Sequence, residues 1–308
     1  MIKIYGAGLA GLLTANVMRK RNPVILEAQP ALPNNHAALL RFRTDKVGRA
    51  CAIPFKKVKV KKAIKYDCEI HTKPDLFFSN LYSQKVTTAI LSRSIDDLES
   101  AERYVAPENL INQMANGCEI EYNKELGKYD IFDEDPIIST IPMPVLMKIV
   151  NWADMPNFSS KTIYTQKAII EDPECDVYQT IYYPDPLESH YRISIIGNVV
   201  TSEHITKPEN HIGDHIMSAL SEDFGIKARK LNDLKSSSQK YGKIRPINEE
   251  LRKEFIYEMT DTYKIYSVGR FATWRQLLLD DVVEDIAIVE EFISNQDNYK
   301  RKMHSERS

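Results

Sequence analysis

The chain has 308 residues, of which 43% are hydrophobic and 27% charged, and its formal net charge is −2. This length allows two domains, or one large α/β domain that carries an insertion. No apolar run approaches the ~20 residues that a membrane-spanning helix needs, and a strand is predicted from Ile2, so we expect a cytoplasmic protein without a signal peptide. The cysteines form no CxxC pair and are expected to be reduced thiols (Cys51, Cys68, Cys118 and Cys175).

The first predicted strand runs directly into a glycine-rich turn. Residues 2–5 are followed by Gly6-Ala7-Gly8-Leu9-Ala10-Gly11, the GxGxxG pattern of a dinucleotide-binding βαβ unit. Glu27 ends a second apolar strand, at the separation where an acidic side chain meets a ribose hydroxyl, and it would repel the 2′-phosphate of NADP. We therefore predict a bound dinucleotide, the alternative being a glycine-rich turn in an α/β domain without a ligand.

A strongly basic stretch follows. Between Arg41 and Lys65 there are ten basic residues and one acid, a local charge of +9, which leaves −11 for the rest of the chain. Such an asymmetry favours an anionic partner, either a phosphorylated substrate or nucleic acid. Residues 57–61 (KVKVK) alternate strictly, so the same lysines are equally well explained as the solvated face of an edge strand.

The middle of the chain is predicted to return to the dinucleotide-binding domain. We expect a helix over 96–116, short strands over 119–122 and 128–132, and an apolar strand over 135–142 that ends in small hydroxyl residues and a proline turn. Three β-rich runs follow, at 162–170, 177–183 and 191–200, and predict an antiparallel meander.

The last third is predicted to begin with a helix over 209–224 and a polar, serine-rich link over 235–240. A helix over 249–259, a strand over 263–268 and a long helix over 279–293 then complete the dinucleotide pattern, and residues 295–308 are expected to fray. His211 and His215 stand four residues apart on the first of these helices, but without the glutamate of an HExxH motif they are read as a solvated helix face, and no metal site is predicted.

The predicted fold class is therefore α/β, with a Rossmann-like dinucleotide-binding domain that is discontinuous in sequence and an inserted, antiparallel β-rich substrate domain. The first domain is assigned residues 1–50, 105–150 and 241–295, the second 51–104 and 151–240, and residues 296–308 form a polar tail.

Three segments resemble the FAD-binding elements of flavin amine oxidases and UDP-galactopyranose mutases: the Gly6–Gly11 turn with Glu27, residues 135–142 (DPIISTIP), and residues 268–275 (VGRFATWR). The mutases are the more similar, since Gly269, Arg270, Ala272, Trp274, Arg275 and Asp280 follow the order of their closing motif. The resemblance covers about half of the chain and implies a compact FAD enzyme, but it matches no motif in the β-rich insertion.

The resemblance implies which residues hold FAD. It places the adenosine at the glycine turn and the flavin end near the closing motif, where the last helix offers free backbone N–H groups. The predicted cofactor-binding residues are Gly6, Ala7, Gly8, Leu9, Ala10, Gly11, Glu27, Ala28, Thr140, Gly269, Arg270, Trp274, Arg275 and Asp280.

Candidate catalytic residues are those expected close to the flavin. Arginines there could clamp a phosphate or carboxylate, and a histidine could move protons near neutral pH. The candidates are His36, Arg41, Arg43, Arg245 and Trp274, each of which has a purely structural alternative as a surface or packing residue.

Three functions remain open from the sequence. The first is a flavoenzyme acting on an anionic substrate, at an amine-bearing carbon or a sugar-nucleotide centre. In the second, the substrate is a modified thymine in DNA, as in compact bacteriophage flavoproteins that this chain resembles in length and in its basic block. The third is a non-catalytic protein that uses the fold to bind FAD, nucleic acid or a partner.

Overall fold

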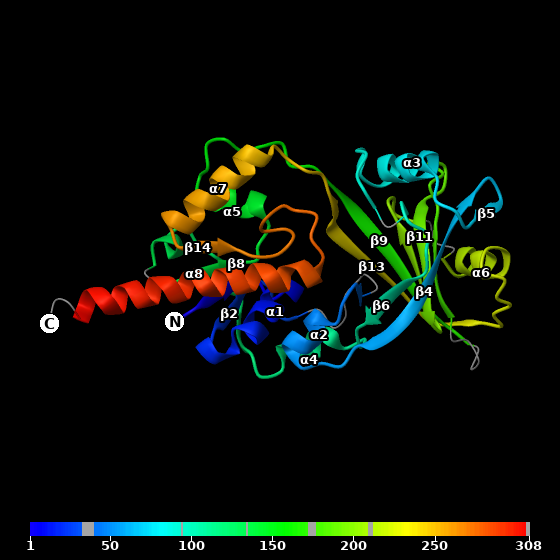
Figure 1. Cartoon of the computed structure of the whole chain (residues 1–308). Coiled ribbons are helices and arrows are strands. Elements are labelled where there is room, and N and C mark those ends of the chain that lie inside the picture. The colour runs from blue at the N-terminus through cyan, green and yellow to red at the C-terminus, as the bar shows by residue number, and fades with distance from the viewer. Residues whose placement is uncertain (33–39, 94, 134, 172–176, 209–211, 306–308) are drawn as a thin grey trace.

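The computed structural model describes residues 1–32, 40–93, 95–133, 135–171, 177–208 and 212–305. The chain forms two sheets that lie at opposite ends of the molecule (Figure 1). Among the described residues, no helix combines the length and the apolar character needed to cross a bilayer.

The first sheet is parallel and is built from both ends of the chain. Its strand order is β14-β8-β1-β2-β7. The strands are β1 (Lys3–Tyr5), β2 (Val24–Glu27), β7 (Glu119–Tyr122), β8 (Ile137–Ser139) and β14 (Ile265–Ser267). Because β1 lies between β2 and β8, the chain reverses direction across the sheet at β1, and ligands of such sheets bind at the carboxyl ends of the strands beside this point.

Helices cover both faces of the parallel sheet because successive strand residues point to opposite sides. Ile4 and Ile138 pack with the helices of one face, α1 (Leu9–Val17), α2 (Lys46–Cys51), α4 (Leu110–Ala115) and α8 (Leu279–Ser305). Tyr5 and Ile137 pack with those of the other, α5 (Met143–Ile149) and α7 (Glu249–Asp261).

The second sheet has nine strands and is mostly antiparallel. Its order is β13-β9-β12-β11-β10-β4-β6-β3, with β5 paired to β4 off this path; the β10–β4 pair is parallel. The strands are β3 (Arg41–Phe42), β4 (Lys56–Tyr66), β5 (Glu69–His71), β6 (Ala101–Val105), β9 (Ser160–Ile170), β10 (Val177–Tyr182), β11 (His190–Gly197), β12 (Val199–His204) and β13 (Leu231–Ile244).

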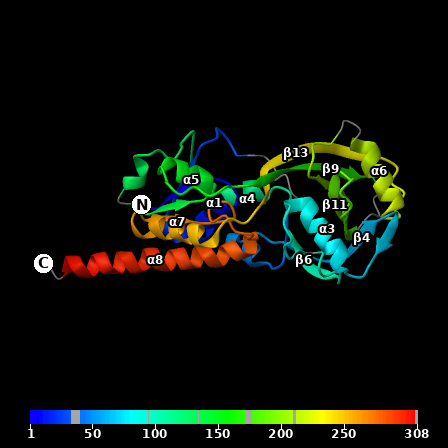
Figure 2. The ribbon, with the colours of Figure 1, turned by 90° about the horizontal axis from the view of Figure 1, so that it is seen from above.

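Two helices pack on opposite faces of this sheet (Figure 2). Helix α3 (Leu76–Thr87) buries Tyr82 and Val86 against Ile64, Tyr182 and Tyr191, and α6 (Ile212–Glu222) buries its apolar residues against the other face. The short 3-10 helices η1 (Arg19–Arg21) and η2 (Asp130–Phe132) complete the elements.

Four expectations from the sequence are wrong. The helix over 96–116 is instead strand β6 followed by the short α4, because residues 101–105 pair with β4. The strand over 128–132 is the 3-10 helix η2, and the serine-rich link over 235–240 lies inside β13, paired with β9. The run over 191–200 is two strands, β11 and β12, that turn around Gly197, whose φ of 64° suits glycine.

Two further expectations are corrected, one on where a helix ends and one on the place of a strand in its sheet. Helix α8 does not stop at residue 293 but continues to Ser305, into the segment that was expected to fray. Strand β4 does expose Lys57, Lys59 and Lys61 and bury Val58 and Val60, as the alternation predicts, but it lies between β10 and β6 and is not an edge strand.

Candidate active site

The glycine turn that follows β1 is held closely against its neighbours. Gly6 has a φ of 100°, and its backbone N–H donates to the Leu26 carbonyl at 2.9 Å. A Cβ on Gly11 would lie 1.9 Å from the Gly6 carbonyl oxygen, so only glycine lets α1 approach the turn this closely. A Cβ on Gly8, in contrast, would meet nothing within 4 Å. The first and third glycines therefore build the turn, and the second leaves space beside it.

Two side chains support the turn from neighbouring strands. Glu27 accepts hydrogen bonds from the backbone N–H of Ala7 at 2.6 Å and from that of Gln29 at 2.8 Å. Thr140, which follows β8, donates to the Tyr5 carbonyl at 2.9 Å. The ends of three adjacent strands thus meet at the turn, where a parallel sheet binds its ligands.

A pocket of about 980 Å³ begins at this turn and extends to the second sheet. Near the turn it is lined by Gly6, Ala7, Gly8, Leu9, Ala10, Glu27, Ala28 and Thr140, and at the other end by side chains of β3, β4, β6, β10, β11, β12 and β13. Ligand pockets in proteins are typically about 300–1,000 Å³, so this one has room for a large ligand.

The part of the pocket at the second sheet is rich in cations. We call this part of the lining the cationic wall: it includes Arg41, Lys62, Arg93, Arg103, Arg192, Lys243 and Arg270, and Glu203 is its one carboxylate among the residues that the structure describes. Glu203 is occupied: both of its oxygens accept from Arg192, at 2.7 Å for the Nη2 bond, and Tyr191 donates to it at 3.0 Å. Burial alone would raise the pKa of Glu203, but Arg192 lowers it to about 2.

Arg41 is the clearest example of a cation in this wall that has no acidic partner among the described residues. It comes from the short β3, and its guanidinium donates to Thr180 Oγ1 on β10 at 2.5 Å, a neutral partner. Burial and the neighbouring Arg192 lower its pKa to about 10. An anion in the pocket would stabilise the charged guanidinium against both burial and the repulsion from Arg192, because it would supply an opposite charge.

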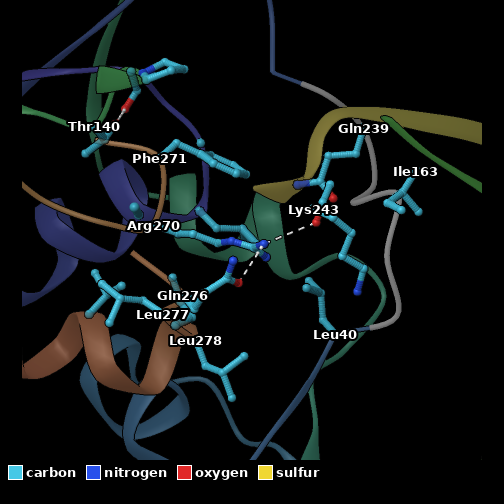
Figure 3. Close-up of a pocket in the computed structure, with 18 of the residues that line it drawn as sticks. Leu40, Thr140, Ile163, Gln239, Lys243, Arg270, Phe271, Gln276, Leu277 and Leu278 are labelled. Atoms are coloured by element: carbon cyan, nitrogen blue, oxygen red, sulfur yellow. Dashed lines mark hydrogen bonds between the residues drawn. The ribbon is translucent and has the colours of Figure 1, made fainter. Parts of the chain in front are cut away.

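The closing motif lines the same pocket through Arg270 and Phe271. Gly269 has a φ of 94°, and a Cβ there would lie 2.7 Å from Ala10 Cβ, so the motif packs directly on α1. Arg270 donates to the Gly242 carbonyl at 3.3 Å and to Gln276 Oε1 at 3.4 Å (Figure 3). Burial lowers its pKa to about 10, and its Nε is buried without a hydrogen-bond partner.

Two of the candidate catalytic residues lie away from the pocket, which corrects the prediction. Trp274 is buried, donates to the Arg245 carbonyl at 2.9 Å, and stacks edge-on with Phe158. Its φ of 48° turns it into the core between α5 and α7. Arg245 is exposed and does not line the pocket. Arg41 and Arg43 do line it, and His36 lies outside the described residues.

Four of the predicted cofactor residues support the pocket rather than line it. Asp280 accepts from the backbone N–H of Arg43 at 3.1 Å and from Thr44 Oγ1 at 2.5 Å, which fastens α8 to the segment after β3. Arg275 pairs with Asp285 on α8. Gly11 and Gly269 permit close packing, as described above, so their contribution to ligand binding is indirect.

The basic stretch of 41–65 does not form one surface. At least six of its ten cations pair with acidic residues that the structure describes: Arg43 with Asp281, Lys46 with Glu284, Arg49 with Asp45, Lys57 with Glu102, Lys62 with Asp97, and Lys65 with Asp223. Arg41 and Lys62 face the pocket, whereas Lys59 and Lys61 are exposed on the outer face of β4.

Most of the cationic wall was missed by the sequence interpretation. Arg93, Arg192 and Glu203 are far apart in sequence and belong to no motif, and Lys243, which begins a proline-containing stretch similar to one in the mutases (residues 243–248), was not proposed as a site residue. The signal available was the presence of charged residues within β-rich runs, at 190–194 (HYRIS) and 201–204 (TSEH), where an inward-pointing charge requires a partner.

His215 is also corrected, because it does not lie on a solvated face. Its ring lies 4.4 Å from that of His190 and 5.9 Å from that of His204, between α6 and the sheet. His211 lies outside the described residues. Within the part of the chain that the structure describes, no group of three or more His, Cys, Asp or Glu residues is arranged to hold a metal ion.

No protein-family model matches the sequence, and no curated protein matches it. Solved structures do match over almost the whole chain. A reduced UDP-galactopyranose mutase aligns with a TM-score of 0.66 at 14% identity, covering 95% of each chain. This chain has the fold of that mutase.

Two other solved structures share the fold. A putrescine oxidase aligns with a TM-score of 0.60 at 11% identity, over 95% of this chain and 98% of that chain. An oxidoreductase from Methanosarcina mazei aligns with a TM-score of 0.54 at 12% identity, over 94% of this chain and 99% of that chain. The predicted fold class, and the predicted resemblance to UDP-galactopyranose mutases and flavin amine oxidases, are confirmed at the level of the fold.

Proposed function

We propose that this protein is an FAD-dependent enzyme that acts on an anionic substrate in the pocket between its two sheets. One observation carries the proposal: one pocket joins a dinucleotide turn to a cationic wall in which Arg41, Lys243 and Arg270 have no acidic partner among the described residues. The likeness to a UDP-galactopyranose mutase and a putrescine oxidase supports the cofactor, although it establishes only the fold.

The residues at the turn fit the adenosine and pyrophosphate of FAD. The space beside Gly8, where a Cβ would meet nothing, lies at the N-terminus of α1, which attracts phosphate through its free N–H groups and dipole. Glu27 lies at the end of β2 with its carboxylate on the pocket, where it can accept from ribose hydroxyls. Thr140 lines the pocket beside the turn, and Arg270 lines it farther along.

When bound, FAD would supply the redox or nucleophilic chemistry, and the protein would bind and orient the substrate. In this proposal Arg41 and Arg270 bind the anionic group of the substrate. Arg192, neutralised by Glu203, shapes the wall beside them, and the buried tyrosines Tyr82, Tyr182 and Tyr191 exclude water from this end of the pocket.

The nature of the anion separates the substrate candidates. A sugar nucleotide would bring two phosphates to the wall, and an amino acid or a similar amine would bring a carboxylate. A modified thymine in DNA would bring a phosphate backbone, for which the exposed Lys59 and Lys61 would be available outside the pocket. A non-catalytic protein would bind FAD without any substrate changing the redox state of the flavin.

The first test of this proposal is the visible absorption spectrum of the purified protein, with the mass of any released cofactor. Flavin bands and the mass of FAD are the expected result, and a colourless protein that refuses added FAD would end the proposal. Substrate classes are then compared as UDP-sugars, amines with a carboxylate, and thymine-modified oligonucleotides, with flavin reduction or turnover as the readout.

Arg41→Met tests the cationic wall. Loss of one charge-assisted interaction of about 1.5–3 kcal/mol should weaken the binding of UDP, measured by calorimetry on the FAD-bound protein, by about 10- to 100-fold. Arg49→Met is the matched control, since Arg49 belongs to the same basic stretch but pairs with Asp45 outside the pocket. Equal weakening by the two variants, or none by the first, would contradict the assignment of Arg41.

A further inference from the structure

Lys243 is the most unusual side chain in the cationic wall. It lies near the carboxyl end of β13 and lines the pocket, with its Nζ 4.8 Å from the centre of the Tyr191 ring. Among the described residues its Nζ has no hydrogen-bond partner and no ion pair, although its backbone belongs to the β13–β9 ladder. Figure 3 shows its side chain extending past Arg270 toward Leu40, into the pocket.

The neighbours of Lys243 disfavour a positive charge on it. Arg192, Arg270 and Arg93 act on it as like charges. Glu203 opposes them, but its carboxylate already accepts from Arg192 and Tyr191, and burial together with the arginines outweighs its effect. Burial and then Arg192 lower the pKa of Lys243 to about 7, so a large fraction of the side chain is a neutral amine at neutral pH.

Two other lysines, Lys85 and Lys62, differ from Lys243 because their ammonium groups have hydrogen-bond or ion-pair partners. Lys85 is also buried, and burial lowers its pKa to about 8, but its ammonium donates to the carbonyls of Tyr183, Asp185 and His190 at 2.5–2.8 Å. Lys62 lines the same pocket and pairs with Asp97 at 3.3 Å. Lys85 and Lys62 therefore serve structural roles, whereas Lys243 has a free lone pair facing an open volume.

We propose that Lys243 is a nucleophilic amine that forms a Schiff base with an anionic ligand carrying an aldehyde or ketone. The Nζ lone pair attacks the carbonyl carbon and forms a C–N bond. The two protons of the neutral amine pass through solvent to the carbonyl oxygen, the C–O bond breaks, and that oxygen leaves as water, which gives a neutral C=N bond. No electrons are gained or lost. The surrounding arginines have two effects, because they attract the anion and keep the amine unprotonated.

This proposal deepens the proposed function, since it assigns a carbonyl group to the anionic substrate class of the same pocket. It does not depend on flavin chemistry. Reaction at Lys243 is therefore measured without turnover, and its failure would leave the FAD proposal intact.

The experiment uses pyridoxal 5′-phosphate, an aldehyde with a phosphate group, on the protein as purified. The imine is trapped with sodium cyanoborohydride, and the modified lysines are located by peptide mass spectrometry between pH 6 and 10. We expect Lys243 to be labelled at least tenfold faster than the exposed Lys59 and Lys61 at pH 7, with a rate that rises around pH 7. Surface lysines, with pKa values near 10.4, should show this rise only at much higher pH.

Two controls separate the parts of the proposal. Pyridoxal, which lacks the phosphate, should label Lys243 with the same pH dependence but more slowly, because the arginines no longer attract it. Lys240→Met, which removes an exposed lysine of the same strand, should leave the labelling unchanged, whereas Lys243→Met should remove the fast phase.

The proposal fails if Lys243 stays unlabelled while the exposed lysines react. It also fails if the labelling of Lys243 rises only above pH 9, as for a surface lysine. Because these outcomes are read on the unmodified sequence, they do not depend on whether Lys243→Met folds.

Discussion

The three glycines of the turn after β1 have separate physical roles. Gly6 adopts a left-handed backbone conformation, Gly11 permits backbone contact between α1 and the turn, and Gly8 leaves the pocket open. The GxGxxG spacing predicted all three roles, because each arises within six consecutive residues and depends little on the rest of the fold.

Substituting Gly8 and Gly11 should therefore have different consequences. Gly8→Ala meets no protein atom and should leave the unfolding temperature of the cofactor-free protein unchanged, while it weakens FAD binding at least tenfold, or by about 1.4 kcal/mol. Gly11→Ala should destabilise the fold itself by about 1–3 kcal/mol, because its Cβ would overlap the Gly6 carbonyl.

FAD titration by fluorescence and urea unfolding of the cofactor-free proteins measure the two effects. A Gly8→Ala variant that binds FAD as tightly as the original chain would show that the pyrophosphate does not lie beside this residue.

Other residue-scale predictions failed where a side chain could turn either way. From the sequence we predicted that Trp274 and Arg245 lie near the flavin. In the structure, Trp274 turns into the core between α5 and α7 and donates to the Arg245 carbonyl. Sequence spacing does not specify this choice, because it depends on which neighbouring elements leave room for the indole ring.

At the scale of elements, the strands of the second sheet were the least predictable. Residues 101–105 have no strong strand pattern. They form β6 because they pair with residues 56–60 of β4, which lie more than 40 residues earlier in the chain. Strand β13 likewise includes the serine-rich segment because β9 pairs with it over almost its whole length. Strand formation at both places is a tertiary effect that overrides local preference.

The same elements bring three histidines together. His190 on β11 and His204 on β12 are buried, and His215 on α6 packs against both. Both ring nitrogens of His190 lack a hydrogen-bond partner, although the Glu188 carboxylate lies 3.5 Å from its Nδ1. Burial first, and then the neighbouring histidines and Lys85, lower the pKa of His190 to about 2 and that of His204 to about 4.

Because of this cluster, we expect the free energy of unfolding to fall in acid through a weakening of the second sheet. Because the folded pKa values lie below the ordinary value of 6.5, the unfolded chain binds more protons, and stability is complete above pH 6.5 and falls as the pH drops toward 4. Each such histidine should contribute up to about 1.4 kcal/mol per pH unit in this window.

Urea unfolding of the original chain and of His190→Phe between pH 7.5 and 4.5 measures this contribution. The variant should lose less stability on acidification, by about one proton in the slope, since carboxylates such as Glu203 affect both proteins equally. Parallel curves for the two proteins would mean that His190 does not stay neutral in the folded state.

At the scale of the whole molecule, the pocket belongs to neither sheet alone. The glycine turn lies on the parallel sheet, the cationic wall lies on the antiparallel sheet, and Arg270 and Leu278 from the end of the chain lie between them (Figure 3). A ligand that fills the pocket thus contacts both sheets and should stabilise the molecule as a unit.

FAD should accordingly raise the stability of the entire chain. At a thousandfold excess over its dissociation constant, a ligand that binds only the folded state adds about 4 kcal/mol. We expect a single thermal transition that moves upward with FAD concentration, and that moves less for Gly8→Ala because tenfold weaker binding removes about 1.4 kcal/mol of this stabilisation. Two separate transitions, only one of which responds to FAD, would show that the two sheets unfold independently.

The sequence by itself determined the parts of this protein that are continuous along the chain. The glycine turn, Glu27 at the end of β2, the alternating lysines of β4 and the order of elements in the parallel sheet follow from local spacing and periodicity. Only the tertiary structure decided the chemistry of the pocket wall, because Arg41 and Arg192 are 151 residues apart in sequence and Arg192 and Lys243 are 51 apart, and they meet only through the pairing of strands across the second sheet. No local pattern encodes such pairing, since the free energy that fixes it comes from burying one face of the whole sheet.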